Sequence, residues 1–217
     1  YIVDASRGRI LREIAVPCEA LFYPAWSPVS DTIAVTGLVN GRTDIWLVHA
    51  EDRRFKPVRV SNNTWDEKEI TFTPDGRSIT YSWDRVARVV VEPLRQQKGY
   101  GAYGLFQLDL MTGETTEVLD TYGDDHAPVW SPNGEVLVFI SDRNGTSNAY
   151  AFDTRDSLIT QLTDVTGGLQ CVSWSRENDR VVFSAYDRGG YDIFALRETI
   201  SLKGVLKRLQ AGHRGGV

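Results

Sequence analysis

The sequence is poor in the residues that build covalent or metal-bound frameworks. Its 217 residues include two cysteines, three histidines and one methionine. Two cysteines, Cys18 and Cys171, are too few for a disulfide framework, and they lack the spacing of metal ligands. No apolar run approaches the roughly 18 residues of a membrane-spanning helix. The net charge of −5 gives no general attraction to phosphate backbones and therefore disfavours a nucleic-acid partner.

The sequence motifs of common enzymes are also missing. There is no Gly-x-Ser-x-Gly elbow, no His-Glu-x-x-His helix, no phosphate-binding Gly-Lys-Ser/Thr loop and no paired-cysteine motif. We therefore expect this chain to be no enzyme by itself, with no catalytic residue, no bound metal and no cofactor.

Turn-forming and aromatic residues are abundant instead. The chain has 19 glycines, eight prolines, six tryptophans, nine tyrosines and eight phenylalanines. Aromatic and β-branched residues favour strands, and glycine and proline favour the turns between them. Because helical periodicity is weak, the composition predicts an all-β chain.

One sequence phrase occurs four times and determines the predicted architecture. Each copy has an aromatic anchor, then an apolar run, then a second aromatic segment. That second segment starts 18 residues after the anchor in three copies and 32 residues after it in the second copy, which therefore carries 14 extra residues. The four anchors are Trp26, Phe72, Trp130 and Trp174.

Each repeat is interpreted as four short antiparallel strands. The Ser-Pro-Asn-Gly stretch at 131–134 suits a tight turn, in which proline fixes φ at the second position and glycine closes the turn. A single four-stranded sheet cannot bury both of its faces, whereas sheets packed face to face around an axis can. The predicted fold is therefore an all-β β-propeller, with four four-stranded antiparallel blades plus a half blade at the N-terminus.

The repeat also predicts the boundaries of the parts. Residues 1–16 are expected to form the last two strands of a preceding blade, and residues 17–209 the four blades. The expected blade boundaries are about 17–61, 62–120, 121–164 and 165–209, with a flexible tail at 210–217. Because the chain begins in mid-blade, we expect further blades from additional sequence of a parent protein or from another subunit.

The repeated phrase resembles the WD-like repeats of TolB-type β-propellers. The resemblance rests on Pro-x-Trp-Ser-Pro-Asn-Gly, an apolar strand, Asp-Arg-x-Gly and then Asn/Asp-Ile followed by an aromatic residue, and it extends to about residue 197. The fourth copy departs from it, with Ser-Arg-Glu-Asn-Asp at 175–179. Similar repeats occur in the periplasmic Tol-Pal component, in propellers attached to bacterial peptidases and in propeller lyases. The resemblance thus implies a bacterial periplasmic or extracellular protein and leaves its function open.

One face of the predicted propeller collects charged residues. The connection into a first strand and the loop between second and third strands open on this face. The candidate binding residues there are Asp66, Glu67, Asp124, Asp125, His126, Arg85, Arg143 and Arg188. Clustered carboxylates near the channel mouth could hold a hard cation or a basic group of a partner. Alternatively, they are solvated and pair with the recurring arginines.

The 14 extra residues of the second copy lie within 85–103, above the same face. Tyr100 and Tyr103 are the candidate binding residues of this insertion. Long loops on rigid scaffolds often carry function, but a tolerated elongation of the blade explains the length equally well.

Two functions of different classes follow from these features. The first is a non-catalytic scaffold that binds a protein or peptide partner on its channel face and is attached to a peptidase or to an envelope complex. The alternative is a metal-dependent, lyase-like propeller enzyme in which the carboxylates and His126 act on an acidic sugar.

Overall fold

The computed structural model describes residues 1–84, 103–121 and 123–197 of the chain. Within these residues all regular secondary structure is β, and there is no helix. The strands form successive antiparallel sheets arranged as blades, so the prediction of an all-β, four-bladed propeller is confirmed.

Four sheets, here called blades A to D, follow one another along the chain. Blade A contains β3 (Ala20–Trp26), β4 (Thr32–Val39), β5 (Arg42–His49) and β6 (Val58–Arg59). Blade B contains β7 (Glu67–Phe72), β8 (Ser78–Trp83), β9 (Gly104–Asp109) and β10 (Thr115–Leu119). Blade C contains β11 (Asp125–Trp130), β12 (Val136–Ser141), β13 (Asn148–Asp153) and β14 (Leu158–Gln161). Blade D contains β15 (Leu169–Trp174), β16 (Arg180–Asp187) and β17 (Gly190–Arg197).

A small fifth sheet precedes the blades. In it, β1 (Ile2–Val3) pairs with β2 (Ile10–Arg12) in antiparallel register. The fourth strand of blade D and the tail at 210–217, both predicted from the sequence, lie outside the described residues.

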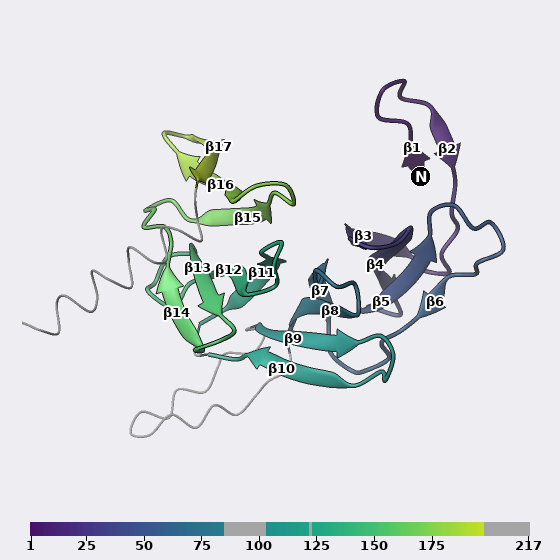
Figure 1. Cartoon of the computed structure of the whole chain (residues 1–217), viewed down its shortest axis with the longest axis horizontal. Coiled ribbons are helices and arrows are strands. Elements are labelled where there is room, and N and C mark those ends of the chain that lie inside the picture. Colours follow the sequence, from purple (N-terminus) through teal and green to yellow (C-terminus); the bar gives the residue numbers. More distant parts are fainter. Residues whose placement is uncertain (85–102, 122, 198–217) are drawn as a thin grey trace, which may run out of the picture.

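The strands of each blade pair in chain order, and the first strands are innermost. Figure 1 shows β3, β7, β11 and β15 on the inner side of the molecule, with β6, β10 and β14 outside. The first strands β3 and β11 both contact β7, and β15 contacts β11. The first strands of neighbouring blades therefore line a common axis.

The hydrophobic core is divided among the spaces between blades. One cluster joins blades A and B around Ile45, Phe72 and Tyr81. Others join blades B and C around Leu105 and Phe139, and blades C and D around Val138, Trp174 and Phe183. Each blade thus buries its faces only against its neighbours, as expected for a propeller.

The turns after the first strands of blades B and C follow the repeated phrase closely. Gly76 and Gly134 both have positive φ, 69° and 72°, and donate backbone hydrogen bonds to Thr73 and Ser131 at 2.8 and 2.9 Å. A Cβ atom at Gly76 would also collide with the side chain of Val29 in blade A. The glycine is therefore required both by the turn and by the close approach of the neighbouring blade.

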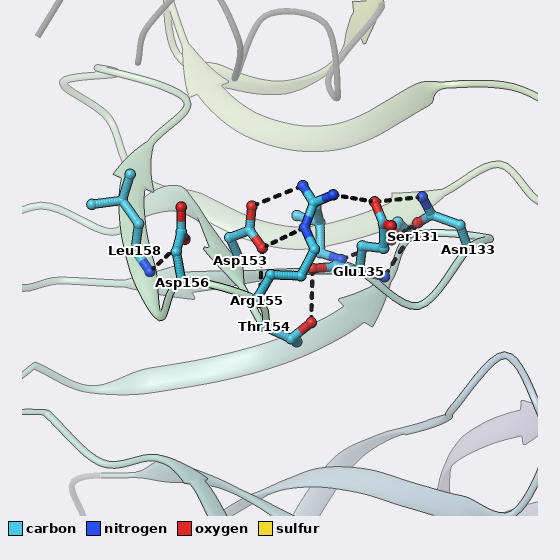
Figure 2. A network of polar contacts seen from close by, with 9 residues as sticks. Ser131, Asn133, Glu135, Asp153, Thr154, Arg155, Asp156 and Leu158 are labelled. Carbon is cyan, nitrogen blue, oxygen red and sulfur yellow. Dashed lines mark hydrogen bonds and ion pairs between the residues drawn. The ribbon is translucent and has the colours of Figure 1, made fainter. Parts of the chain in front are cut away.

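Side chains tie this turn to the outer part of the same blade. In blade C, the Arg155 guanidinium lies 3.2 Å from Glu135 and 3.2 Å from the buried Asp153 (Figure 2). Thr154 donates its backbone N–H and its hydroxyl to the carbonyl of Glu135. This network fixes the β11–β12 turn relative to the β13–β14 turn.

An irregularity recurs in the innermost strands. Tyr23, Glu69 and Ala127 have left-handed φ values of 47°, 53° and 51°, and each lies three residues before the aromatic anchor of its blade. The strand register shifts at the same places. Such bulges interrupt the alternation of side chains and redirect them.

Candidate functional site

Two acids at the starts of first strands bind backbone groups of the preceding blade. The Asp66 carboxylate accepts a hydrogen bond from the Thr43 N–H at 2.8 Å, and the Asp124 carboxylate accepts one from the Tyr103 N–H at 2.8 Å. Thr43 is the second residue of β5, the third strand of blade A, and Tyr103 directly precedes β9, the third strand of blade B. Asp66 and Asp124, two of the predicted binding residues, therefore link consecutive blades.

The loop between second and third strands supports these two links. Asp84 accepts a hydrogen bond from the N–H of Asp66, and Asp142 accepts one from the N–H of Asp124, both at 2.8 Å. The same two-step arrangement thus recurs in blades B and C.

The next residue along each first strand points into the protein. Asp125 is fully buried, and its carboxylate lies 2.8 Å from the Arg143 guanidinium. That guanidinium also lies over the ring of Tyr150, 4.6 Å from its centroid. Asp125 and Arg143 were predicted to bind a ligand, and in the structure they bind each other beneath the surface.

Glu67 occupies the equivalent position in blade B without a cationic partner among the described residues. Its carboxylate accepts a hydrogen bond from the Ser61 hydroxyl at 3.1 Å and a second one from the amide of Asn63. Burial raises the pKa of Glu67 to about 8, because an apolar environment disfavours the charged form.

Tyr103 brings the acids of this end of the channel together. The Lys68 ammonium lies 3.4 Å from the centroid of its ring, a cation–π contact. Burial, together with the negative charges of Asp84, Asp66 and Asp124, raises the pKa of Tyr103 to about 12. Tyr103 and Lys68 thus sit among three carboxylates supplied by blades B and C.

His126 faces a residue that was not among the predicted site residues. Its Nδ1 lies 3.3 Å from the Glu69 carboxylate, which also accepts hydrogen bonds from the Ser82 hydroxyl and the Ala127 N–H at 3.1 and 3.0 Å. Although burial opposes the shift, the hydrogen bond and charge of His126 lower the pKa of Glu69. Burial and the nearby Glu69 raise the pKa of Tyr23, which extends this cluster toward blade A.

Glu69, Lys68 and Tyr23 were not among the predicted site residues. The signal that could have identified Glu69 and Tyr23 is their shared position three residues before the aromatic anchor. Without knowledge of the bulge, simple strand alternation places these side chains on the wrong face.

Three predicted residues remain, and the structure describes one of them, Arg188. The Arg188 side chain is 92% exposed and lies 3.9 Å from the neighbouring Asp187. Arg85 and Tyr100 lie outside the described residues.

A cavity of about 470 Å³ lies at the opposite ends of the first strands. Its walls are the last residues of β3, β7, β11 and β15 and the turns that follow them. The repeated phrase thus lines one axial cavity in all four copies, while the acids lie at the other ends of the same strands.

Two observations concern metals and membranes. Within residues 1–84, 103–121 and 123–197, no three His, Cys, Asp or Glu side chains gather in a way that could hold a metal ion. The same part of the chain contains no helix long and apolar enough to span a bilayer.

The fold of this chain is similar to that of several solved protein structures. The described chain superimposes on a TolB-like protein from Agrobacterium tumefaciens with a TM-score of 0.69 and 19% identity, covering 86% of this chain and 65% of that one. The chain has the fold of TolB-type β-propellers. No family model matches the sequence.

The same propeller fold occurs in proteins with other activities. A puromycin hydrolase matches with a TM-score of 0.64 and 16% identity, over 85% of this chain and 28% of the hydrolase. An oligogalacturonate lyase in complex with manganese matches with a TM-score of 0.57 and 15% identity, over 83% of this chain and 50% of the lyase. These likenesses establish the propeller alone.

Two relatives share more sequence with the propeller over shorter stretches. An uncharacterised protein of Agrobacterium fabrum is 26% identical over 121 residues, which is 56% of this chain and 36% of the relative. An uncharacterised peptidase of Bacillus subtilis is 28% identical over 114 residues, or 51% of this chain and 16% of the peptidase. The matched region therefore spans well under half the length of either relative.

Proposed function

We propose that the chain is a non-catalytic β-propeller scaffold that binds a protein or peptide partner on its channel face. The observation that supports this proposal is the set of groups around Tyr103. A cation, an aromatic ring and three carboxylates from two blades gather there on rigid strand ends. Mixed charged and aromatic groups on a fixed scaffold suit recognition of another polypeptide.

Neutralising the two blade-linking acids tests this proposal. An asparagine can still accept the backbone N–H, so Asp66→Asn and Asp124→Asn together should keep the fold while removing two negative charges. We expect the double variant to capture at least tenfold less partner from a bacterial envelope extract, measured by quantitative mass spectrometry. Asp75→Asn, which removes an exposed acid from a turn at the other end of the channel, is the control.

The result would contradict the proposal if the double variant, with an unchanged melting temperature, captured the same proteins in the same amounts as the wild type. Failure of the wild type to enrich any protein over an empty matrix, or an equal loss of capture in Asp75→Asn, would contradict it as well.

We further propose that the scaffold works within a larger protein or assembly in the bacterial periplasm or outside the cell. The TolB-like fold and the sequence similarity to a Bacillus subtilis peptidase support this. In a peptidase context, the propeller would position or admit substrate for a separate catalytic domain. Fractionation of the source cells, with antibody detection of the native protein, tests both compartment and total length.

The alternative is a metal-dependent, lyase-like propeller enzyme acting on an acidic sugar. Its support is the contact between His126 and Glu69 near the axis, together with the shared fold of the manganese-bound lyase. Elemental analysis of the purified chain and a spectrophotometric assay for unsaturated products from polygalacturonate test it. A stoichiometric metal together with activity that His126→Gln abolishes would favour this enzyme over the scaffold.

A further inference from the structure

The axial cavity is lined by an unusual set of residues. Five of its lining residues are proline and four are aromatic, and Arg176 is the one charged residue among those described. Its volume of about 470 Å³ falls within the range of ligand pockets. Proline has no N–H, so these walls offer rings and carbonyl groups to a ligand more than backbone donors.

Two indole rings in the wall are held in place by their own hydrogen bonds. Trp130 donates its Nε1–H to the Thr80 hydroxyl at 2.9 Å, and Trp26 donates to the Ser30 carbonyl at 3.2 Å. Trp26 nevertheless remains 45% exposed. Rings fixed before binding lose little conformational entropy when a ligand stacks on them.

The guanidinium of Arg176 has hydrogen-bond donors to spare at the wall of the cavity. Arg176 uses one nitrogen, Nη2, to donate to the Trp26 carbonyl at 2.8 Å, and no other hydrogen bond or ion pair of its guanidinium occurs within the described part of the chain. The side chain is exposed, so its remaining N–H groups are accessible to an oxygen of a ligand.

We propose that this cavity binds an extended, proline-containing segment of a partner protein, with an acidic side chain of that segment at Arg176. Proline rings stack well on fixed indoles, and a polyproline II segment is already extended before it binds. A carboxylate suits the planar guanidinium of Arg176, which can donate two parallel hydrogen bonds to it. This inference rests on the proposed function and names a partner chemistry and a second contact region for it.

The other end of the channel makes the choice of an acidic segment more specific. Asp66, Asp84 and Asp124 surround Tyr103 at the strand starts, whereas the cavity at the strand ends is lined by no acid among the described residues. An acidic ligand is therefore repelled at one end and accepted at the other.

Isothermal titration calorimetry of the full chain with short peptides tests the proposal. The probe is Pro-Pro-Glu-Pro-Pro, acetylated and amidated so that its only charge is the glutamate. Three comparison peptides are used. In the first, glutamine replaces glutamate, and the second is this glutamine peptide with a free C-terminal carboxylate. In the third, glycine replaces every proline of the probe. We expect the probe to bind at least tenfold more tightly than any of the three.

Protein variants locate the binding. Arg176→Gln should weaken binding of the probe at least tenfold, because it removes the charged donors from the cavity. Arg180→Gln, an exposed arginine four residues away that does not line the cavity, should change nothing.

Several results would overturn the proposal. The first two are the absence of any heat of binding at millimolar probe and equal affinity for the glutamate and glutamine peptides. The other two are tightest binding of the peptide with a free C-terminus and wild-type affinity of a folded Arg176→Gln variant. Because the capture experiment with Asp66→Asn and Asp124→Asn concerns the opposite end, its outcome is separate. If the double variant loses capture of the partner but the wild type does not bind the probe peptide, the cavity proposal is wrong and the proposed function is still supported.

Discussion

Two acids at the same position of successive repeats are buried in different ways. Asp125 lies against the guanidinium of Arg143, whereas Glu67 accepts hydrogen bonds from Ser61 and Asn63. A buried carboxyl group with neutral donors keeps its proton more readily than one paired with arginine. The junction between blades A and B is therefore expected to respond to pH in a way that the next junction does not.

Replacing Glu67 by glutamine tests this difference. The pKa of Glu67 is raised from 4.5 to about 8, so between these values the folded state holds a proton that the unfolded chain releases. Stability contributed by this group therefore falls as pH rises from about 4.5 to about 8 and is constant above that range. The stability of Glu67→Gln relative to the wild type should therefore rise across this window, by on the order of 5 kcal/mol at its upper end.

Urea unfolding at pH 5, 7 and 9 measures that gain, and the exposed Glu114→Gln serves as control. The control should differ from the wild type by about the same small amount at every pH. A Glu67→Gln difference that does not change with pH would show that Glu67 is ionised in the folded protein.

Arginines between the second and third strands of blades C and D allow a comparison of a buried and an exposed arginine. Arg143→Leu leaves the buried carboxylate of Asp125 without its partner and should lower the free energy of unfolding by about 3–5 kcal/mol. Arg188→Leu, where the side chain is 92% exposed, should change it by less than about 0.5 kcal/mol. Equal effects in denaturant unfolding would mean that the Asp125 pair does not stabilise the blade.

At the level of strands, the sequence predicts the end of the first strand of a blade but not the bulge in its middle. The aromatic anchors and the turns with Gly76 and Gly134 follow from the sequence, because proline and glycine restrict the backbone in known ways. The bulge does not follow, since a left-handed φ is uncommon for residues such as Tyr23, Glu69 and Ala127.

The variant Ala127→Gly tests whether the backbone of the bulge in β11 is strained. The left-handed conformation disfavours alanine by about 1–2 kcal/mol, which offsets the entropy that glycine loses on folding. Ala127→Gly should therefore change stability by less than about 0.5 kcal/mol. Ala151→Gly, in the buried third strand of the same blade, should cost about 1 kcal/mol or more. Thermal unfolding of both variants makes the comparison, and equal losses would argue against strain.

The same limit explains which part of the site the sequence could predict. The acids Asp66 and Asp124 stand out by their repeated position, and the structure places both at one end of the channel. Their use as hydrogen-bond acceptors for the preceding blade depends on contacts between residues more than 20 apart in sequence. Glu69 approaches His126 over an even longer separation, and no local pattern indicates that contact.

For the whole molecule, the uneven covering of the blades is the main feature. Blades B and C have a neighbouring blade on both sides. Blade D, in contrast, exposes large apolar side chains of β17, with Ile193 83% and Tyr191 55% exposed. Exposed apolar patches of this kind mark interaction surfaces or cause aggregation. We propose that a further blade or another subunit packs against this face.

A charge on that surface should change how the chain associates. We expect the purified chain to self-associate with rising concentration in sedimentation velocity experiments and Ile193→Glu to reduce this association severalfold. Met111→Glu, at a residue that is 91% exposed in the turn between β9 and β10, should behave like the wild type. Identical profiles for all three proteins would indicate that the exposed face of blade D does not drive association.

The links made by Asp66 and Asp124 have a consequence for how freely the repeats can change. Both acids bind main-chain N–H groups, those of Thr43 and Tyr103, and every residue except proline carries such a group. Asp66 also accepts a hydrogen bond from the Thr43 hydroxyl, whereas Asp124 binds the backbone of residue 103 and not its side chain. Blade B can therefore diverge in sequence at position 103, or receive an insertion just before it, and still be held in place by the blade that follows it.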